Sequence, residues 1–171
     1  MNQNFNQIPA VFRNYLLDYL TVLKDKFKDH LLSVILFGSV ARGQWKKESD
    51  IDLLLILADE TPSTPELNQE LTEITIEFET KNVLLDAKGN TLYCPIKEVA
   101  FLLKELEQFR TLFYDISVDG IIFYDRFKVG KNFQEKIRNR ITEKGLERVD
   151  TGGNIFYWKR KAIKFGEIIE L

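Results

Sequence analysis

Two short motifs in the first third of the chain contain the residue types needed for chemistry at phosphate groups. Gly38 and Ser39 follow the apolar run 31–37, and Asp50 and Asp52 begin a second apolar run. Two carboxylates at positions i and i+2 of a strand point to the same face, so Asp50 and Asp52 can share divalent metal ions. A Gly-Ser turn that leads into a helix offers free backbone N–H groups to an anion. Together the motifs predict metal-assisted phosphoryl chemistry on a nucleotide.

The elements expected around these motifs are two strands joined by a tight turn and a short helix. The first strand spans 31–37, Gly38 makes the turn, and a helix of one or two turns starts at Ser39. The second strand spans 50–57, and its unbroken apolar stretch suggests that both of its faces are covered. An amphipathic helix over about 9–29 precedes them, because apolar residues recur there at i, i+3 and i+4.

The rest of the chain gives weaker signals. Residues 66–79 fit a helix face, although 74–78 alternates like a strand; a helix is preferred because the fold needs a crossover there. Pro95 suggests that the third strand is an edge strand or contains a bulge. The further expected elements are a strand at 91–97, helices at 98–108 and about 109–118, a strand at 120–124, a helix capped by Asn132 and ended near Gly145, and two short strands in the tail from 146 to 171.

This order predicts an α/β (α+β) protein with a small mixed sheet flanked by helices. At 171 residues the chain is expected to form one domain, with a motif core over about 9–105 and an extension over about 106–171. Its 44% hydrophobic and 29% charged residues are ordinary for a soluble globular protein, and no apolar run approaches the roughly 20 residues of a membrane helix. A single cysteine excludes an internal disulfide, and these features favour the cytoplasm.

The spacing of Gly-Ser and Asp-x-Asp resembles that of the nucleotidyltransferases of the DNA polymerase β superfamily, and most closely the minimal nucleotidyltransferases. The resemblance implies that Asp50 and Asp52 bind Mg²⁺ or Mn²⁺ and that Gly38 and Ser39 hold the β/γ-phosphate end of a nucleoside triphosphate. It implies transfer of a nucleoside monophosphate, with ATP as the expected donor, to a hydroxyl acceptor. The acceptor is left open among a small helical toxin-like partner protein, as in toxin–antitoxin pairs, a small molecule and an RNA end.

The superfamily pattern includes a third carboxylate on a later strand, and this chain departs from it. The expected strand 91–97 contains no acid; Cys94 stands about where the third acid should be, with Glu98 just beyond and Asp86 before. Either acid is a possible substitute. If the third position is empty, metal affinity and general-base help are reduced, and the alternative function is a degenerate module that binds a nucleotide or a partner.

Two features leave more than one interpretation open. Arg42 lies three residues after Ser39 on the same face of a short helix, where it either reaches a phosphate or lies on the surface. Residues 48–90 contain eleven acids and two lysines, whereas residues 126–164 contain twelve basic residues and four acids. The basic segment is either a solvated face or a surface for the triphosphate, a nucleic acid or an acidic partner.

Overall fold

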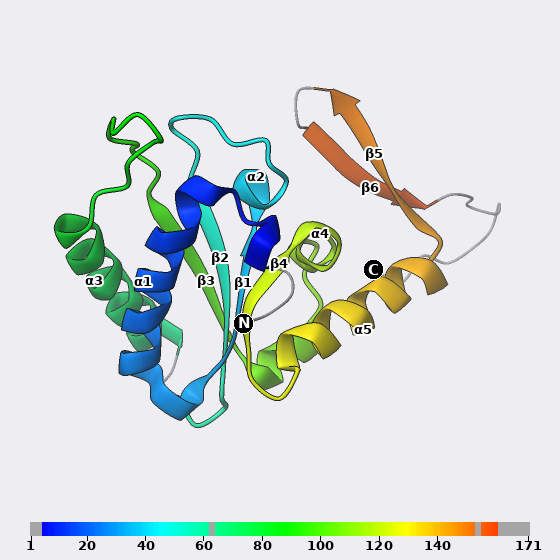
Figure 1. The fold of residues 1–171 in the computed structure, drawn as a ribbon. Helices are drawn as coiled ribbons and strands as arrows, with labels where there is room; N and C mark the ends of the chain where they lie inside the picture. Colours follow the sequence, from blue (N-terminus) through cyan, green and yellow to red (C-terminus); the bar gives the residue numbers. More distant parts are fainter. Residues whose placement is uncertain (1–4, 62–63, 153–154, 161–171) are drawn as a thin grey trace.

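The computed structural model describes residues 5–61, 64–152 and 155–160, and it places a four-stranded sheet between two layers of helices (Figure 1). A separate two-stranded hairpin follows the last helix. The helices are α1 (Ala10–Phe27), α2 (Gly38–Ala41), α3 (Thr64–Lys81), α4 (Leu112–Asp119) and α5 (Val129–Glu143), with 3-10 turns at Phe5–Gln7, Lys28–His30 and Leu103–Glu107. The strands are β1 (Leu31–Phe37), β2 (Ile51–Leu57), β3 (Ile96–Leu102), β4 (Ile121–Asp125), β5 (Leu146–Gly152) and β6 (Ile155–Arg160).

The main sheet has the strand order β3-β2-β1-β4. Strand β1 is antiparallel to both of its neighbours, and β2 is parallel to β3, to which it is connected through α3. This mixed sheet flanked by helices confirms the predicted α+β class. Every residue of β1 is buried, as expected for a central strand that is covered on both faces and is apolar apart from Ser33.

Alternate residues of the sheet enter two different apolar cores. Leu53, Leu55 and Leu57 pack with α1 and α3, whereas Leu54 and Ile56 pack with α4 and α5. Successive side chains of a strand point to opposite faces, so Asp52 shares the face of Leu54. Asp52, near the start of β2, therefore points toward the α4 side of the sheet.

The two strands and the short helix around the motifs lie where the sequence predicts them, and α3 confirms the helix preferred for 66–79. The predicted strand 91–97 and helix 98–108 are wrong. Residues 96–102 form β3, followed by the 3-10 turn, because pairing with β2 buries Ala100, Phe101 and Leu102. Pro95 comes immediately before this edge strand, where its carbonyl accepts the N–H of Ile51 at 2.8 Å.

The predicted cap of the last helix is also wrong. Helix α5 begins at Val129, before Asn132. Asp125, at the end of β4, accepts the N–H groups of Gly130 at 2.7 Å and Lys131 at 3.1 Å. An acceptor on the preceding strand thus satisfies the free N–H groups of this helix start. The two short strands predicted in the tail are confirmed as β5 and β6.

The segment after residue 105 does not stand apart from the main sheet. Strand β4 pairs with β1, so this segment supplies one of the four strands. The hairpin β5–β6 extends beyond α4 and α5 (Figure 1). Within the part of the chain that the structure describes, no helix is long and apolar enough to cross a membrane.

Candidate active site

The turn at Gly38 packs directly against the carboxylate of Asp52. Gly38 has a φ of 72°, in the left-handed region that favours glycine, and a Cβ built at this position would collide with Asp52 Oδ2. The contact follows from the sheet register, because Phe37 at the end of β1 pairs with Asp52 at the start of β2. Gly38 therefore allows the close approach of an acid as well as the turn itself.

Asp52 lies in a partly buried position with an acidic neighbour. Burial, and after it the negative charge of Asp50, raise the pKa of Asp52 to about 6, while the cation of Arg42 lowers it. A cation placed between two carboxylates stabilises their charged forms, and this effect is largest where burial and mutual repulsion disfavour the charge. Mg²⁺ commonly takes one or two carboxylates and completes its shell with water and phosphate oxygens, so Asp50 and Asp52 fit it as ligands.

Ser39 is the second residue of α2 and is half-buried. The residue that caps α2 is Phe37, and no side chain caps this helix start. Ser39 follows Gly38 directly in this turn. The structure brings Gly38, Ser39 and Asp52 together at the junction of β1 and β2, as the sequence predicts, while their roles toward a nucleotide are a proposal.

The candidate third acids do not join Asp50 and Asp52 in a cluster. Glu98 is paired with Leu53, so it faces the α1 side of the sheet, opposite to Asp52. There its carboxylate accepts hydrogen bonds from the hydroxyls of Tyr19 and Thr75, and burial raises its pKa. The residue paired with Asp52 on β3 is Lys97.

The other two candidates have local structural roles. Cys94 is buried in the core with α1, its thiol donates to the carbonyl of Lys47 at 3.4 Å, and burial together with nearby Asp50 raises its pKa. Asp86 is half-buried and accepts the N–H groups of Lys88 and Asn90, each at 2.8 Å. Among the described residues no three His, Cys, Asp or Glu side chains form a group that could hold a metal ion.

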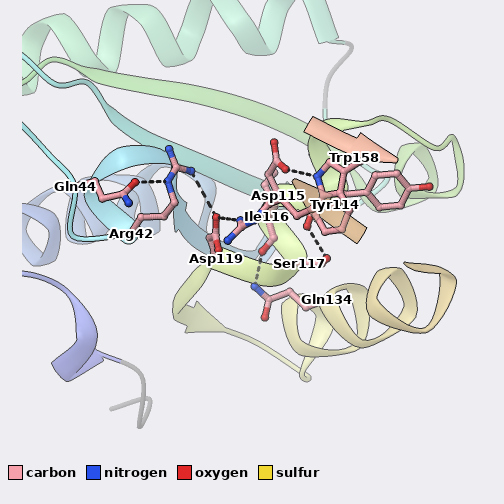
Figure 2. A network of polar contacts seen from close by, with 10 residues as sticks. Arg42, Gln44, Tyr114, Asp115, Ile116, Ser117, Asp119, Gln134 and Trp158 are labelled. Carbon is pink, nitrogen blue, oxygen red and sulfur yellow. Dashed lines mark hydrogen bonds and ion pairs between the residues drawn. The ribbon is translucent and has the colours of Figure 1, made fainter. Parts of the chain in front are cut away.

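Arg42 lies at the end of α2 and joins the site to α4 and the hairpin (Figure 2). Its Nε donates to Gln44 Oε1 at 3.2 Å, and a terminal nitrogen lies 3.6 Å from Asp119 Oδ2. The guanidinium carbon is 5.2 Å from the centre of the Phe156 ring. Because the charge of Arg42 lowers the pKa of Asp52, Arg42 is close enough to act on this acid.

The sequence motifs do not indicate the residues of α4 and of the hairpin β5–β6 that lie around Arg42. Arg148 of β5 also binds Asp119 and lies over Phe156 of β6. One turn earlier on α4, Asp115 accepts the indole N–H of Trp158 at 2.7 Å. These contacts join segments far apart in the chain, so no local motif marks them.

Several basic side chains of the segment 126–164 form ion pairs with acidic side chains of the protein. The structure records such pairs for Arg126 with Asp29, Lys131 with Glu135, Lys136 with Glu107, Arg148 with Asp119 and Lys159 with Glu147. Most of these side chains are exposed, and such pairs contribute little to stability. The pairing favours a solvated face for this segment, of which residues 161–164 lie outside the described residues.

Comparison with known proteins places the chain in a family. The sequence pattern of the family described as "Nucleotidyltransferase domain" matches residues 18–149, which is most of the chain and includes both motifs. The chain belongs to this nucleotidyltransferase domain family and is a nucleotidyltransferase.

Two relatives come from Methanocaldococcus jannaschii, and both are provisionally named protein adenylyltransferases. MJ1305 is 32% identical over 128 residues, which is 75% of this chain and 82% of the relative. MJ0141 is 39% identical over 79 residues, which is 46% of this chain and 74% of the relative.

Solved structures resemble the chain more distantly. A chain of a toxin–antitoxin MntA-HpeT crystal structure is 18% identical with a TM-score of 0.49, covering 75% of this chain and 90% of that one. A chain of the Shewanella oneidensis complex of a tri-AMPylated HEPN toxin with an MNT antitoxin is 16% identical with a TM-score of 0.43, covering 75% and 91%.

Proposed function

We propose that this nucleotidyltransferase moves AMP from Mg-ATP to a hydroxyl group of a partner protein. The observation that carries the proposal is Asp52 packed against the Gly38 turn, with Asp50 close enough to help raise the pKa of Asp52, which is about 6. The choice of AMP and of a protein acceptor rests on the relatives named as protein adenylyltransferases.

In this reaction the acceptor oxygen forms a bond to the α-phosphorus of ATP. The bond from that phosphorus to the bridging oxygen breaks, pyrophosphate leaves, and the hydroxyl proton passes to solvent. Asp50 and Asp52 would hold Mg²⁺ or Mn²⁺, which supplies charge neutralisation at the phosphate oxygens. Gly38 and Ser39 would bind the β/γ-phosphates through backbone N–H groups and the serine hydroxyl, and Arg42 would add a cation.

The two-acid site affects rate more than binding. Among the described residues no third His, Cys, Asp or Glu joins Asp50 and Asp52 in a group that could hold a metal ion. General-base help typically contributes a factor of about 10² to 10⁴ to the rate, so we expect slow transfer in which positioning supplies most of the acceleration. The partner is proposed to be a small helical toxin-like protein encoded beside this one, and a nucleic-acid acceptor is the less favoured choice.

The test follows label from ATP to protein. The full chain is incubated with Mg²⁺ and the purified product of the neighbouring gene, once with ATP labelled at the α-phosphate and once with ATP labelled at the γ-phosphate. Only the α label is expected to enter the partner, and only when Asp50 and Asp52 are intact. Label from the γ-phosphate would indicate a kinase, and nucleotide binding without any transfer would support the degenerate binding module.

A further inference from the structure

Asp119 is the last residue of α4 and lies on the same side of the sheet as Asp52. Its side chain is 10% exposed, and its Oδ2 atom contacts two cations, Arg42 of α2 and Arg148 of β5. A carboxylate in such a position is costly to bury unless it is paired, so its contacts with the two arginines are strongly favoured. Asp119 thus joins the end of α2 to the hairpin β5–β6 (Figure 2).

The guanidinium of Arg42 is held from three directions. Gln44 accepts from Nε, Asp119 faces a terminal nitrogen, and the guanidinium carbon lies over the Phe156 ring, 5.2 Å from its centre. A free arginine side chain has many rotamers, and fixing it on binding costs free energy. A guanidinium that is already oriented avoids that cost when an anion arrives.

We propose that Asp119 is a positioning residue of the nucleotide site, which holds Arg42 ready for the phosphates of the bound triphosphate. The inference rests on the proposed role of Arg42 in nucleotide binding. Asp119 acts through Arg42 and does not touch the substrate. Arg148 keeps the Asp119 carboxylate in place from the other side, and its guanidinium lies 4.7 Å from the centre of the same Phe156 ring.

The chain offers a matched control one turn earlier on the same helix. Asp115 also fastens the hairpin to α4, because it accepts the Trp158 indole N–H at 2.7 Å. Asp115→Asn therefore weakens the docking of the hairpin but leaves in place Asp119, the carboxylate that forms the ion pair with Arg42; the charge of Arg42 is only the smallest influence on the pKa of Asp115. A difference between Asp119→Asn and Asp115→Asn separates the positioning of Arg42 from the docking of the hairpin.

The experiment measures the dissociation constant of Mg-ATP by calorimetry, and KM and kcat in the transfer assay, with the full chain. Asp119→Asn is expected to raise the dissociation constant and KM about threefold to tenfold, the size of coupling usual between contacting polar groups. The kcat value should change less than KM, since the chemical step does not use Asp119. Asp115→Asn is expected to leave the dissociation constant within about twofold of the wild-type value. Equal losses in the two variants would overturn the proposal.

A double-mutant cycle with Arg42→Met tests whether Asp119 acts through Arg42. Once Arg42 is gone, Asp119→Asn should cause no further loss of Mg-ATP affinity; an undiminished loss would contradict the inference. If Arg42→Met alone has no effect, the proposed role of Arg42 in binding fails instead. If Asp119→Asn does not fold, Asp119→Glu gives the same cycle, because it keeps a charge for Arg148 but displaces the carboxylate from Arg42.

Discussion

Replacement of Gly38 by alanine provides a sharp test of the site geometry, because the chain contains a glycine with nearly the same backbone and an open environment. Gly38 has a φ of 72° and Gly43 a φ of 69°. A left-handed conformation costs a residue with a Cβ about 1–2 kcal/mol, so both Gly38→Ala and Gly43→Ala should lose about that much stability. At Gly43 an added Cβ meets nothing within 4 Å, whereas at Gly38 it collides with the Asp52 carboxylate.

The collision at Gly38 adds a second cost and a functional effect. Forcing extra volume into a packed site typically costs about 1–3 kcal/mol, so Gly38→Ala should lose about 2–5 kcal/mol in all. Asp52 must also move away from its place beside the turn, and Mg-ATP affinity should fall at least about tenfold. Gly38→Val should behave in the same way.

The assay for these variants combines urea unfolding with calorimetric titration of Mg-ATP. Gly43→Ala should bind Mg-ATP within about twofold of the wild-type affinity despite its lower stability. If folded Gly38→Ala binds Mg-ATP as well as Gly43→Ala does, the reasoning about the Gly38–Asp52 contact is refuted.

Two further predictions concern Glu98 and Cys94, which lie outside the pair Asp50 and Asp52. Burial raises the pKa of Glu98, so the folded protein disfavours its charged form; the cost is absent below the ordinary pKa of glutamate and complete above the raised value. The melting temperatures of Glu98→Gln and the wild type should be measured at pH 4 and pH 8. The melting temperature of the variant relative to the wild type should be higher at pH 8 than at pH 4. An equal difference at both pH values would contradict the raised pKa of Glu98. Cys94→Asp introduces a carboxylate into the core with α1, so its melting temperature should fall without a gain in Mn²⁺ affinity. Tighter Mn²⁺ binding by a stable Cys94→Asp protein would show that this position can supply the third acid.

The parts of the fold that the sequence predicts well are those in which local pattern and sheet position agree. The runs 31–37 and 51–57 are apolar except for Ser33 and Asp52, and they form the two central strands of the main sheet. The Gly-Ser and Asp-x-Asp motifs lie at the junction of these strands, so the paired acid and the turn could be placed without any long-range information.

The sequence predicts the third strand too early in the chain, because neither 91–97 nor 96–102 shows a clear strand period. Residues 91–97 alternate as well as 96–102 do, and only pairing with β2 selects the second segment. The error affects the site, since the true register puts Lys97 opposite Asp52 and turns Glu98 to the other face. A missing third acid could be suspected from the sequence, but the direction of Glu98 could not be known.

The surroundings of Arg42 could not be predicted from local pattern. Asp119 and Arg148 become its neighbours only when α4 and the hairpin pack on the sheet. In the sequence they are ordinary charged residues of a helix end and a basic tail. Long-range ion pairs have no fixed spacing, so only the three-dimensional structure reveals them.

The central claim is that Asp50 and Asp52 together hold the metal-bound nucleotide. Calorimetric titration of Mg-ATP into the wild type, into Asp50→Asn/Asp52→Asn and into the control Asp18→Asn/Asp25→Asn tests it most directly. The control removes the same charge from two exposed positions of α1. We expect Mg²⁺-dependent ATP binding by the wild type and the control, and none by the folded Asp50→Asn/Asp52→Asn protein. Unchanged Mg-ATP affinity in that folded variant would contradict the claim.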